Sequence, residues 1–247
     1  MKRLITTCLF RARATTLVAM LALAVLLSTQ TIVSAVTPVT PLPTKWTQMP
    51  DLENGTAWSS SNGWYIAADD YLCENPLPVN DVHWWGSYWA GQDPQPINGF
   101  TIRFFSDVPA SPTGEFSHPG DLLYQAYIAG NCNETYYGNS EPYGLNVYQY
   151  NAILLEPFEQ DYGTTYWLSI QLNPGWTEPP YWGWYTSADH WQDIAVQAEE
   201  PSPWNWYQAI DSANQDLAFQ LTVVPEPATI CLLGLGALSL IRRKRSV

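Results

Sequence analysis

The sequence predicts an all-β fold: a two-sheet antiparallel β-sandwich, jelly-roll-like, with one short apolar helix at each end of the chain. Apolar residues alternate with a period of two in short runs bounded by Gly, Pro, Asn or Asp, as in half-buried antiparallel strands. No stretch keeps a 3.6-residue period with helix caps. With 46% hydrophobic and 13% charged residues, the 247-residue chain can bury a sizeable core, and two packed sheets would bury these apolar faces.

Four runs carry the alternation most clearly. The residues on one side of each run are Phe100, Ile102 and Phe104; Leu122, Tyr124, Ala126 and Ile128; Tyr166, Leu168, Ile170 and Leu172; and Leu217, Phe219, Leu221 and Val223. Further strands are expected at residues 64–68, 82–89, 147–155 and 181–186. Residues 189–197 and 209–215 can each hold a turn or two of helix, and the absence of an internal repeat disfavours a propeller.

The N-terminal segment has the parts of a secretory signal peptide. Residues 1–35 combine a basic start, an apolar run from Leu17 to Leu27 and small residues before a cleavage site expected after Ala35. Eleven apolar residues are too few for a permanent membrane-spanning helix. Residues 36–45 then form a Pro- and Thr-rich linker, and residues 46–223 show no break in composition, so we expect one domain there.

The C-terminal segment, residues 224–247, resembles the PEP-CTERM sorting tail of bacterial envelope proteins. Pro225, Glu226 and Pro227 precede an apolar run from Ala228 to Ile241 and a basic end from Arg242 to Arg245. The resemblance implies recognition by an exosortase-type membrane protease. The basic end stays cytoplasmic while the apolar run holds the exported domain at the membrane, so the tail is expected to be a transient anchor.

Acidic residues dominate the chain between these two segments. Residues 36–224 hold two basic and 22 acidic residues, a net formal charge of −20. This charge repels phosphate backbones and anionic lipids, which excludes a nucleic-acid partner. Solubility of an aromatic-rich exported protein explains the acidity, and attraction of divalent cations is the alternative.

Cysteine usage leaves one pair in the exported domain. Cys8 and Cys231 lie in the two end segments, whereas Cys73 and Cys132 would meet an oxidising compartment. A disulfide between them would close a loop of about 60 residues and contribute on the order of 4 kcal/mol. Two buried free thiols are the alternative.

Several segments of residues 50–224 resemble an uncharacterised secreted β-sandwich domain that recurs in exported bacterial proteins, joined to PEP-CTERM tails or to dockerin-like ends. The segments are Ala68 to Tyr71, Asp81 to Trp89, and residues 99–107, 122–128 and 163–171. The resemblance implies the fold and the export route, and it brings no known activity.

Residues suited to catalysis are scarce. The carboxylate pairs Asp69 with Asp70 and Glu199 with Glu200 are expected to be solvated or turn-forming rather than a glycosidase pair, with calcium coordination by Asp69 and Asp70 as an alternative. Three histidines, His83, His118 and His190, follow no zinc spacing, and no nucleophile elbow, phosphate loop or dinucleotide fingerprint occurs. We therefore predict no catalytic residue, no metal site and no cofactor, calcium being the one exception left open.

Arg103 is the one basic residue within a predicted strand of the domain. Its expected role is a bidentate pairing with a carboxylate on a neighbouring strand. Its alternative role is to anchor an acidic sugar.

Tryptophan pairs are the feature that suggests recognition. Trp182 with Trp184, and Trp204 with Trp206, each lie two residues apart, so in extended chain each pair shares one face at a spacing of about 7 Å. Two such indoles can stack on successive sugar rings. The competing interpretation is that they fill or seal the sandwich, although flanking prolines favour exposed loops.

These observations together predict an exported, envelope-sorted, non-catalytic protein with a structural or adhesive role at the cell surface or in a polysaccharide matrix. A carbohydrate-binding module and a glycan-active enzyme are the two alternatives. The expected partners are signal peptidase, the exosortase-type protease, the membrane through the tail and, in the matrix, polysaccharide.

Overall fold

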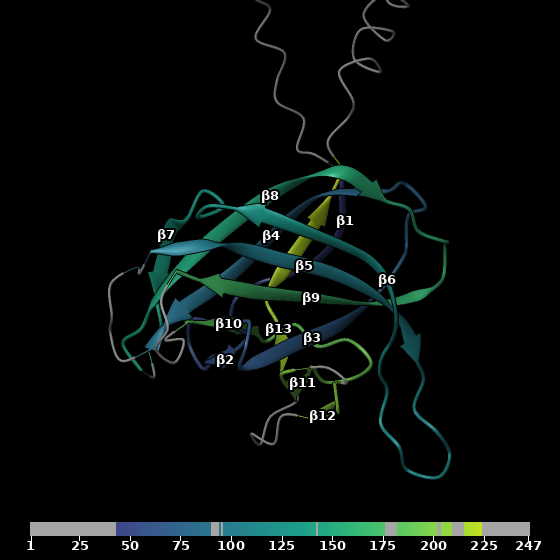
Figure 1. Ribbon diagram of the computed structural model, residues 1–247. Coiled ribbons are helices and arrows are strands. Elements are labelled where there is room, and N and C mark those ends of the chain that lie inside the picture. Colours follow the sequence, from purple (N-terminus) through teal and green to yellow (C-terminus); the bar gives the residue numbers. More distant parts are fainter. Residues whose placement is uncertain are drawn as a thin grey trace, which may run out of the picture. The chain divides into compact units, whose positions relative to one another are not determined.

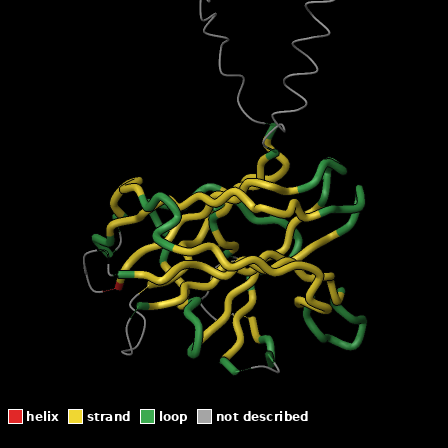
Figure 2. The backbone as a smooth tube through the Cα atoms, turned by 45° about the horizontal axis from the view of Figure 1, so that its top comes forward, coloured by secondary structure: helices red, strands yellow, loops and turns green. Residues whose placement is uncertain are grey.

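Two antiparallel β-sheets form the body of the protein in the computed structural model, which describes residues 43–89, 94, 96–141, 143–175, 182–201, 204–208 and 215–223 (Figure 1). Strands make up most of this part of the chain, as Figure 2 shows, and the described residues contain no α-helix. None of the described residues forms a helix long and apolar enough to cross a membrane. The predicted all-β sandwich is therefore confirmed, while the two expected terminal helices lie outside the described residues.

The larger sheet has eight strands, with the order β1-β14-β4-β10-β13 and with β2, β8 and β7 attached to this path. Its strands are β1 (Thr44–Gln48), β2 (Ala57–Ser59), β4 (Val79–Tyr88), β7 (Thr135–Asn139), β8 (Asn146–Phe158), β10 (Trp182–Ser187), β13 (Asp216–Leu217) and β14 (Phe219–Thr222).

The smaller sheet has six strands in the order β12-β11-β3-β9-β5-β6. Its strands are β3 (Tyr65–Leu72), β5 (Ile97–Val108), β6 (His118–Ala129), β9 (Thr165–Pro174), β11 (Val196–Glu199) and β12 (Tyr207–Gln208). The chain crosses between the sheets repeatedly, for example from β3 to β4 and from β4 to β5, so both sheets combine segments distant in sequence.

Two expectations about local structure were wrong. Residues 44 and 45, expected in the linker, belong to β1, which pairs with β14. The Lys45 ammonium group donates hydrogen bonds to the carbonyl oxygens of Asn75 and Leu77, which holds this polar strand in place. Residues 189–197 form no helix, and their end belongs to β11. Of the second expected helical stretch, residues 209–214 lie outside the described residues.

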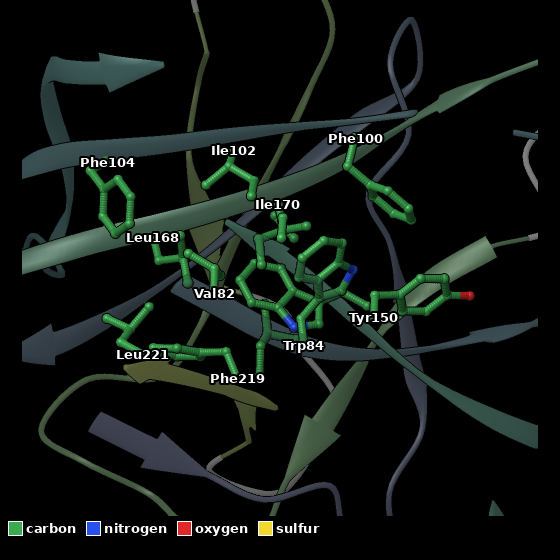
Figure 3. Close-up of a cluster of buried hydrophobic side chains, with 14 of the residues drawn as sticks. Val82, Trp84, Phe100, Ile102, Phe104, Tyr150, Leu168, Ile170, Phe219 and Leu221 are labelled. Carbon is green, nitrogen blue, oxygen red and sulfur yellow. The ribbon is translucent and has the colours of Figure 1, made fainter. Parts of the chain in front are cut away.

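The main core lies between the sheets and is built largely of aromatic rings. Trp84 of β4 packs edge-on against Phe100 of β5, with ring centroids 4.9 Å apart, and stacks on Tyr150 of β8 at 5.6 Å (Figure 3). Phe100 also meets Trp182 of β10 edge-on at 5.2 Å. These contacts join the two sheets, because β5 belongs to the smaller sheet and the other three strands to the larger one. The alternating side predicted from Phe100, Ile102 and Phe104 is fully buried here.

The Trp182 ring packs against Gly86 of the neighbouring strand β4. In the pairing of β10 with β4, Trp182 lies opposite Tyr88 and Trp184 lies opposite Gly86. A Cβ atom on Gly86 would lie 2.4 Å from the Trp182 ring, a distance that no real Cβ contact adopts. The absence of a side chain at position 86 is therefore what admits the indole.

We expect Gly86→Ala to lower the free energy of unfolding by about 1 to 3 kcal/mol, because the extra methyl group overpacks the core. Combining Gly86→Ala with Trp182→Phe should cost less than the sum of the two single changes, since the smaller ring leaves room for the methyl. Urea denaturation of the four proteins measures the coupling. Strictly additive effects would contradict this packing.

Candidate functional site

The first tryptophan pair does not form a surface platform. Trp182 and Trp184 are fully buried in β10, where their side chains face the core. The Trp182 indole NH donates to the Tyr150 hydroxyl at 3.1 Å, and the Trp184 indole NH donates to the Ala218 carbonyl at 2.9 Å. The prediction of a sugar platform here is wrong, because β10 is an interior strand paired on both sides.

The second pair lies on the outer face of the smaller sheet. Trp204 and Trp206 are partly buried and pack edge-on against Phe105 of β5, with ring centroids 5.6 and 6.2 Å apart. Their own rings are 6.0 Å apart and tilted by 52°. The two indole rings are therefore inclined to each other and form one wall of a groove, instead of the flat platform expected from an extended chain.

This wall borders a groove of about 500 Å³, which we call the tryptophan groove. It is lined by Trp204, Asn205 and Trp206 on one side and by Gly114, Glu115, Phe116 and His118 on the other. The second side comes from the connection between β5 and β6, which extends beyond the sheets (Figure 1). Two indoles beside a carboxylate, an imidazole and an amide suit a ligand that combines apolar faces with hydroxyl groups.

Arg103 contacts the Trp204 ring of the tryptophan groove. Its guanidinium carbon lies 5.5 Å from the centroid of the Trp204 ring, within cation–π range. Arg103 donates hydrogen bonds to Gln125 Oε1 at 2.8 Å and Gln171 Oε1 at 2.9 Å, so the expected carboxylate partner is replaced by two amides. Burial lowers the pKa of the Arg103 guanidinium, an effect that the charge of Glu200 opposes. The Trp204 indole NH donates to that same Glu200 at 3.3 Å.

Asp69 and Asp70 are buried within the fold, which overturns the expectation that they are solvated or turn-forming. Asp69 of β3 faces the other sheet, and its Oδ2 accepts hydrogen bonds from the Leu217 NH at 2.7 Å and the Gln48 amide at 3.2 Å. The same Gln48 nitrogen donates to Asp216 Oδ2 at 3.1 Å. One amide of β1 thus bridges two buried carboxylates on different sheets.

Asp216 has further partners, whereas the Asp70 carboxyl oxygens have none. Asp216 Oδ1 pairs with His190 Nδ1 at 2.9 Å, and its Oδ2 accepts from the Trp191 NH at 2.7 Å. Both carboxyl oxygens of Asp70 are buried without a hydrogen-bond partner among the described residues. An unpartnered carboxylate in such surroundings is costly, so the neutral form is favoured.

The pKa values of the three carboxyls follow from this burial. Burial raises the pKa of Asp70 to about 9, with the charges of Asp216, Asp193 and Asp107 adding to the effect. Burial also raises the pKa of Asp216 to about 6, against the lowering effect of the Trp191 NH and His190. For Asp69, burial and the nearby Asp216 charge raise the pKa well above its usual range.

The two cysteines of the domain do not form a disulfide. Cys73 and Cys132 are buried free thiols, so the predicted disulfide is absent and the alternative interpretation holds. The Cys73 thiol contacts the Asn75 carbonyl oxygen at 3.2 Å, while burial raises the pKa of Cys132 to about 12.

Among the described residues, no group of three or more His, Cys, Asp or Glu side chains is arranged to hold a metal ion. Ala35, Pro225, Glu226 and Pro227 lie outside the described residues.

The fold and its grooves define a β-sandwich module with a surface groove of aromatic and polar side chains. The chain belongs to the family described as domain of unknown function DUF7901, whose model matches residues 44–222. Residues 223–245 match the PEP-CTERM protein-sorting motif. No curated protein and no solved structure matches the chain. The resemblance to a PEP-CTERM protein with an uncharacterised domain is confirmed, and the protein is exported, processed by exosortase and sorted to the cell envelope.

The buried carboxyls predict an unusual pH dependence of stability. The folded domain holds protons on Asp70 and Asp216 that the unfolded chain releases above its ordinary carboxyl pKa near 3.8. The contribution of these two carboxyls to the free energy of unfolding should therefore be fully present below about pH 4. It should fall as pH rises, until about pH 6 for Asp216 and about pH 9 for Asp70, by up to about 1.4 kcal/mol per pH unit for each such proton.

Asp70→Asn removes one of these protons while keeping the side-chain shape. We expect the variant to be more stable than the parent protein at pH 8 and nearly equal to it at pH 4, as thermal melts at both values will show. Asp121→Asn, at an exposed carboxylate, is the matched control and should change neither. A loss of stability in Asp70→Asn at both pH values would disprove a buried neutral carboxyl.

Proposed function

We propose that the domain is a non-catalytic adhesive module of the cell envelope that holds a surface or matrix polysaccharide in the tryptophan groove. The observation that carries this proposal is the composition of that groove, in which Trp204 and Trp206 meet Glu115, His118 and Asn205. Indole faces favour the C–H faces of sugar rings, and the polar groups accept and donate hydrogen bonds to hydroxyls.

The support of Trp204 from behind favours binding. Arg103 is held by Gln125 and Gln171 and lies over the Trp204 ring, while Glu200 accepts from the indole NH. These contacts fix the ring before a ligand arrives, which reduces the entropy lost on binding. A groove built in advance suits a protein whose role is retention.

A non-catalytic role is favoured by the location of Asp69 and Asp70, one of the two acidic pairs singled out in the sequence. Asp69 and Asp70 are fully buried, so a polysaccharide does not reach them. Hydrolysis needs two carboxyl groups on either side of a bound glycosidic bond. Because both side chains are buried, we infer that these acids affect the stability of the fold instead.

Export supplies the setting in which such a module acts. We infer that signal peptidase cleaves after Ala35, that the apolar run of the tail holds the protein at the membrane for a time, and that exosortase then releases the domain. A polysaccharide-binding groove would retain the released domain in the matrix. The sorting motif supports export and processing by exosortase.

Replacing Trp204 with Ala tests the groove. We expect Trp204→Ala to weaken retention on the host's cell-surface polysaccharide by about 1 to 3 kcal/mol, the range seen for aromatic stacking on flat ligands. The exposed Trp64, which does not line the groove, provides the matched control Trp64→Ala. Affinity electrophoresis in gels containing the polysaccharide measures retention, and a melting curve for each variant checks the fold. Equal retention by both variants and the parent protein would refute the proposal.

The sorting scheme makes a separate prediction. The envelope-associated protein should lack most of residues 228–247, because exosortase is expected to separate the apolar run from the domain after Pro225, Glu226 and Pro227. Mass spectrometry of peptides from the sorted protein decides this. Recovery of peptides containing Arg242 to Val247 would contradict removal of the tail.

A further inference from the structure

A second and larger cavity is lined by β4, β8 and the end of β6. It has a volume of about 730 Å³ and shares no lining residue with the tryptophan groove. The lining residues at the end of β6 are residues 128–133. We call it the asparagine groove, after Asn131, Asn133 and Asn151.

The amides of the asparagine groove are held in place but only partly used. Asn133 donates through Nδ2 to Asn151 Oδ1 at 2.6 Å. The other polar atom of each side chain, and the whole amide of Asn131, have no hydrogen-bond partner among the described residues. The pair can therefore accept through Asn133 Oδ1 and donate through Asn151 Nδ2 to one ligand, an arrangement suited to a hydroxyl group.

The backbone positions these amides rigidly. Cys132 and Asn133 have φ angles of 49° and 53°, in the left-handed region that residues other than glycine seldom adopt. The Cys132 side chain is buried in the main core, and the Cys132 carbonyl accepts from the Asn151 NH at 2.8 Å. The loop is thus tied to both the core and β8. Strained backbone that persists under such ties is concentrated at ligand sites.

The single carboxylate of the asparagine groove already has partners. Asp81 pairs with His83 Nε2 at 2.9 Å and accepts a hydrogen bond from the Thr222 hydroxyl. The Nδ1 atom of His83 is buried and has no partner in the described part of the chain. A groove whose carboxylate is already hydrogen-bonded offers little to a free cation, and no Lys or Arg lines it to hold an acidic sugar.

Aliphatic side chains line the asparagine groove beside the amides. They are Ile128, Ala152 and Ile153, and Ile153 is 64% exposed although it is a large aliphatic residue. Amides and aliphatic carbon in one groove match the hydroxyl edge and the C–H face of a sugar ring.

We propose that the asparagine groove is a second saccharide-binding site that takes an uncharged sugar unit, with Asn133 and Asn151 as the hydrogen-bonding pair. The proposal takes its ligand class from the function proposed above and rests on it in that respect. Two sites on one domain would allow it to join two polysaccharide segments, and simultaneous engagement raises the overall avidity.

Isothermal titration of the full chain tests this, in a zwitterionic detergent without a sugar headgroup. The neutral probes are cellohexaose, laminarihexaose and mannohexaose, and hexagalacturonate is the acidic probe. We expect a neutral probe to bind at two sites, and the Trp204→Ala variant to keep one of them. Adding Asn133→Ala and Asn151→Ala should weaken that remaining site about tenfold, as the loss of one or two neutral hydrogen bonds predicts.

The matched control removes an equivalent amide pair elsewhere on the same hairpin. Asn139 donates to Asn146 Oδ1 at 3.4 Å, and neither residue lines the asparagine groove. Asn139→Ala with Asn146→Ala should leave the remaining site unchanged. Should the first double variant unfold, Asn131→Trp, at an exposed loop position, fills the groove and should abolish the same site.

The outcomes separate the two proposals. Loss of all binding in Trp204→Ala, or equal affinity after the asparagine changes, would overturn the second site and leave the tryptophan groove standing. Binding that depends on the asparagines alone would support the second site and overturn the first. Preference of the asparagine groove for hexagalacturonate would overturn its assignment to an uncharged sugar, and a parent protein that binds no probe would overturn both.

Discussion

Four aromatic rings packed between the sheets set the constraint on which the other features depend. Trp84, Phe100, Tyr150 and Trp182 form five ring contacts with centroid distances from 4.9 to 6.0 Å, and they come from four strands, of which only β4 and β5 are consecutive in the chain. Edge-to-face and stacked pairs of this kind add to the large hydrophobic contribution of each ring. Because this cluster fixes which face of each strand points inward, it also fixes which residues reach the outer face.

The tryptophan groove lies on the outer face of the smaller sheet because alternate side chains of β5 point to opposite faces. With Phe104 turned into the core, Phe105 must face outward, where Trp204 and Trp206 cover it. Arg103 shares that outward side and supports Trp204. The same alternation sends Asp69 inward and Asp70 outward on β3, and both are buried because each face of the smaller sheet is covered. A strongly acidic domain thus keeps three of its carboxyls away from water, where the neutral form is favoured.

Period-two alternation made most of the fold predictable from the sequence. The strands around Phe100, Leu122, Tyr166 and Phe219 were expected because each run is long and its apolar side is unbroken. β1, β7 and β12 were missed because they are short and lack an unbroken apolar side, and the partner of β1 also lies far away in sequence. The bridge from Gln48 to Asp69 and Asp216 could not be predicted either, because it joins residues that are distant in sequence.

The tryptophan pairs show what sequence spacing leaves undecided. Trp182 with Trp184 and Trp204 with Trp206 have the same spacing and similar proline-rich surroundings, yet the first pair is interior and the second borders a groove. Strand position decided the outcome, since β10 is paired on both sides. The asparagine groove was not foreseen, because the positive φ angles of Cys132 and Asn133 and the contact between Asn133 and Asn151 arise only in the folded chain.

The place of β14 in the larger sheet has a consequence for folding. This strand lies between β1 and β4, and it ends at Thr222, one residue before the sorting motif begins. The larger sheet is therefore incomplete until the last residues of the domain are available to pair. A chain that lacks them leaves one edge of β1 and one edge of β4 without a partner strand, and unpaired strand edges of this kind favour aggregation.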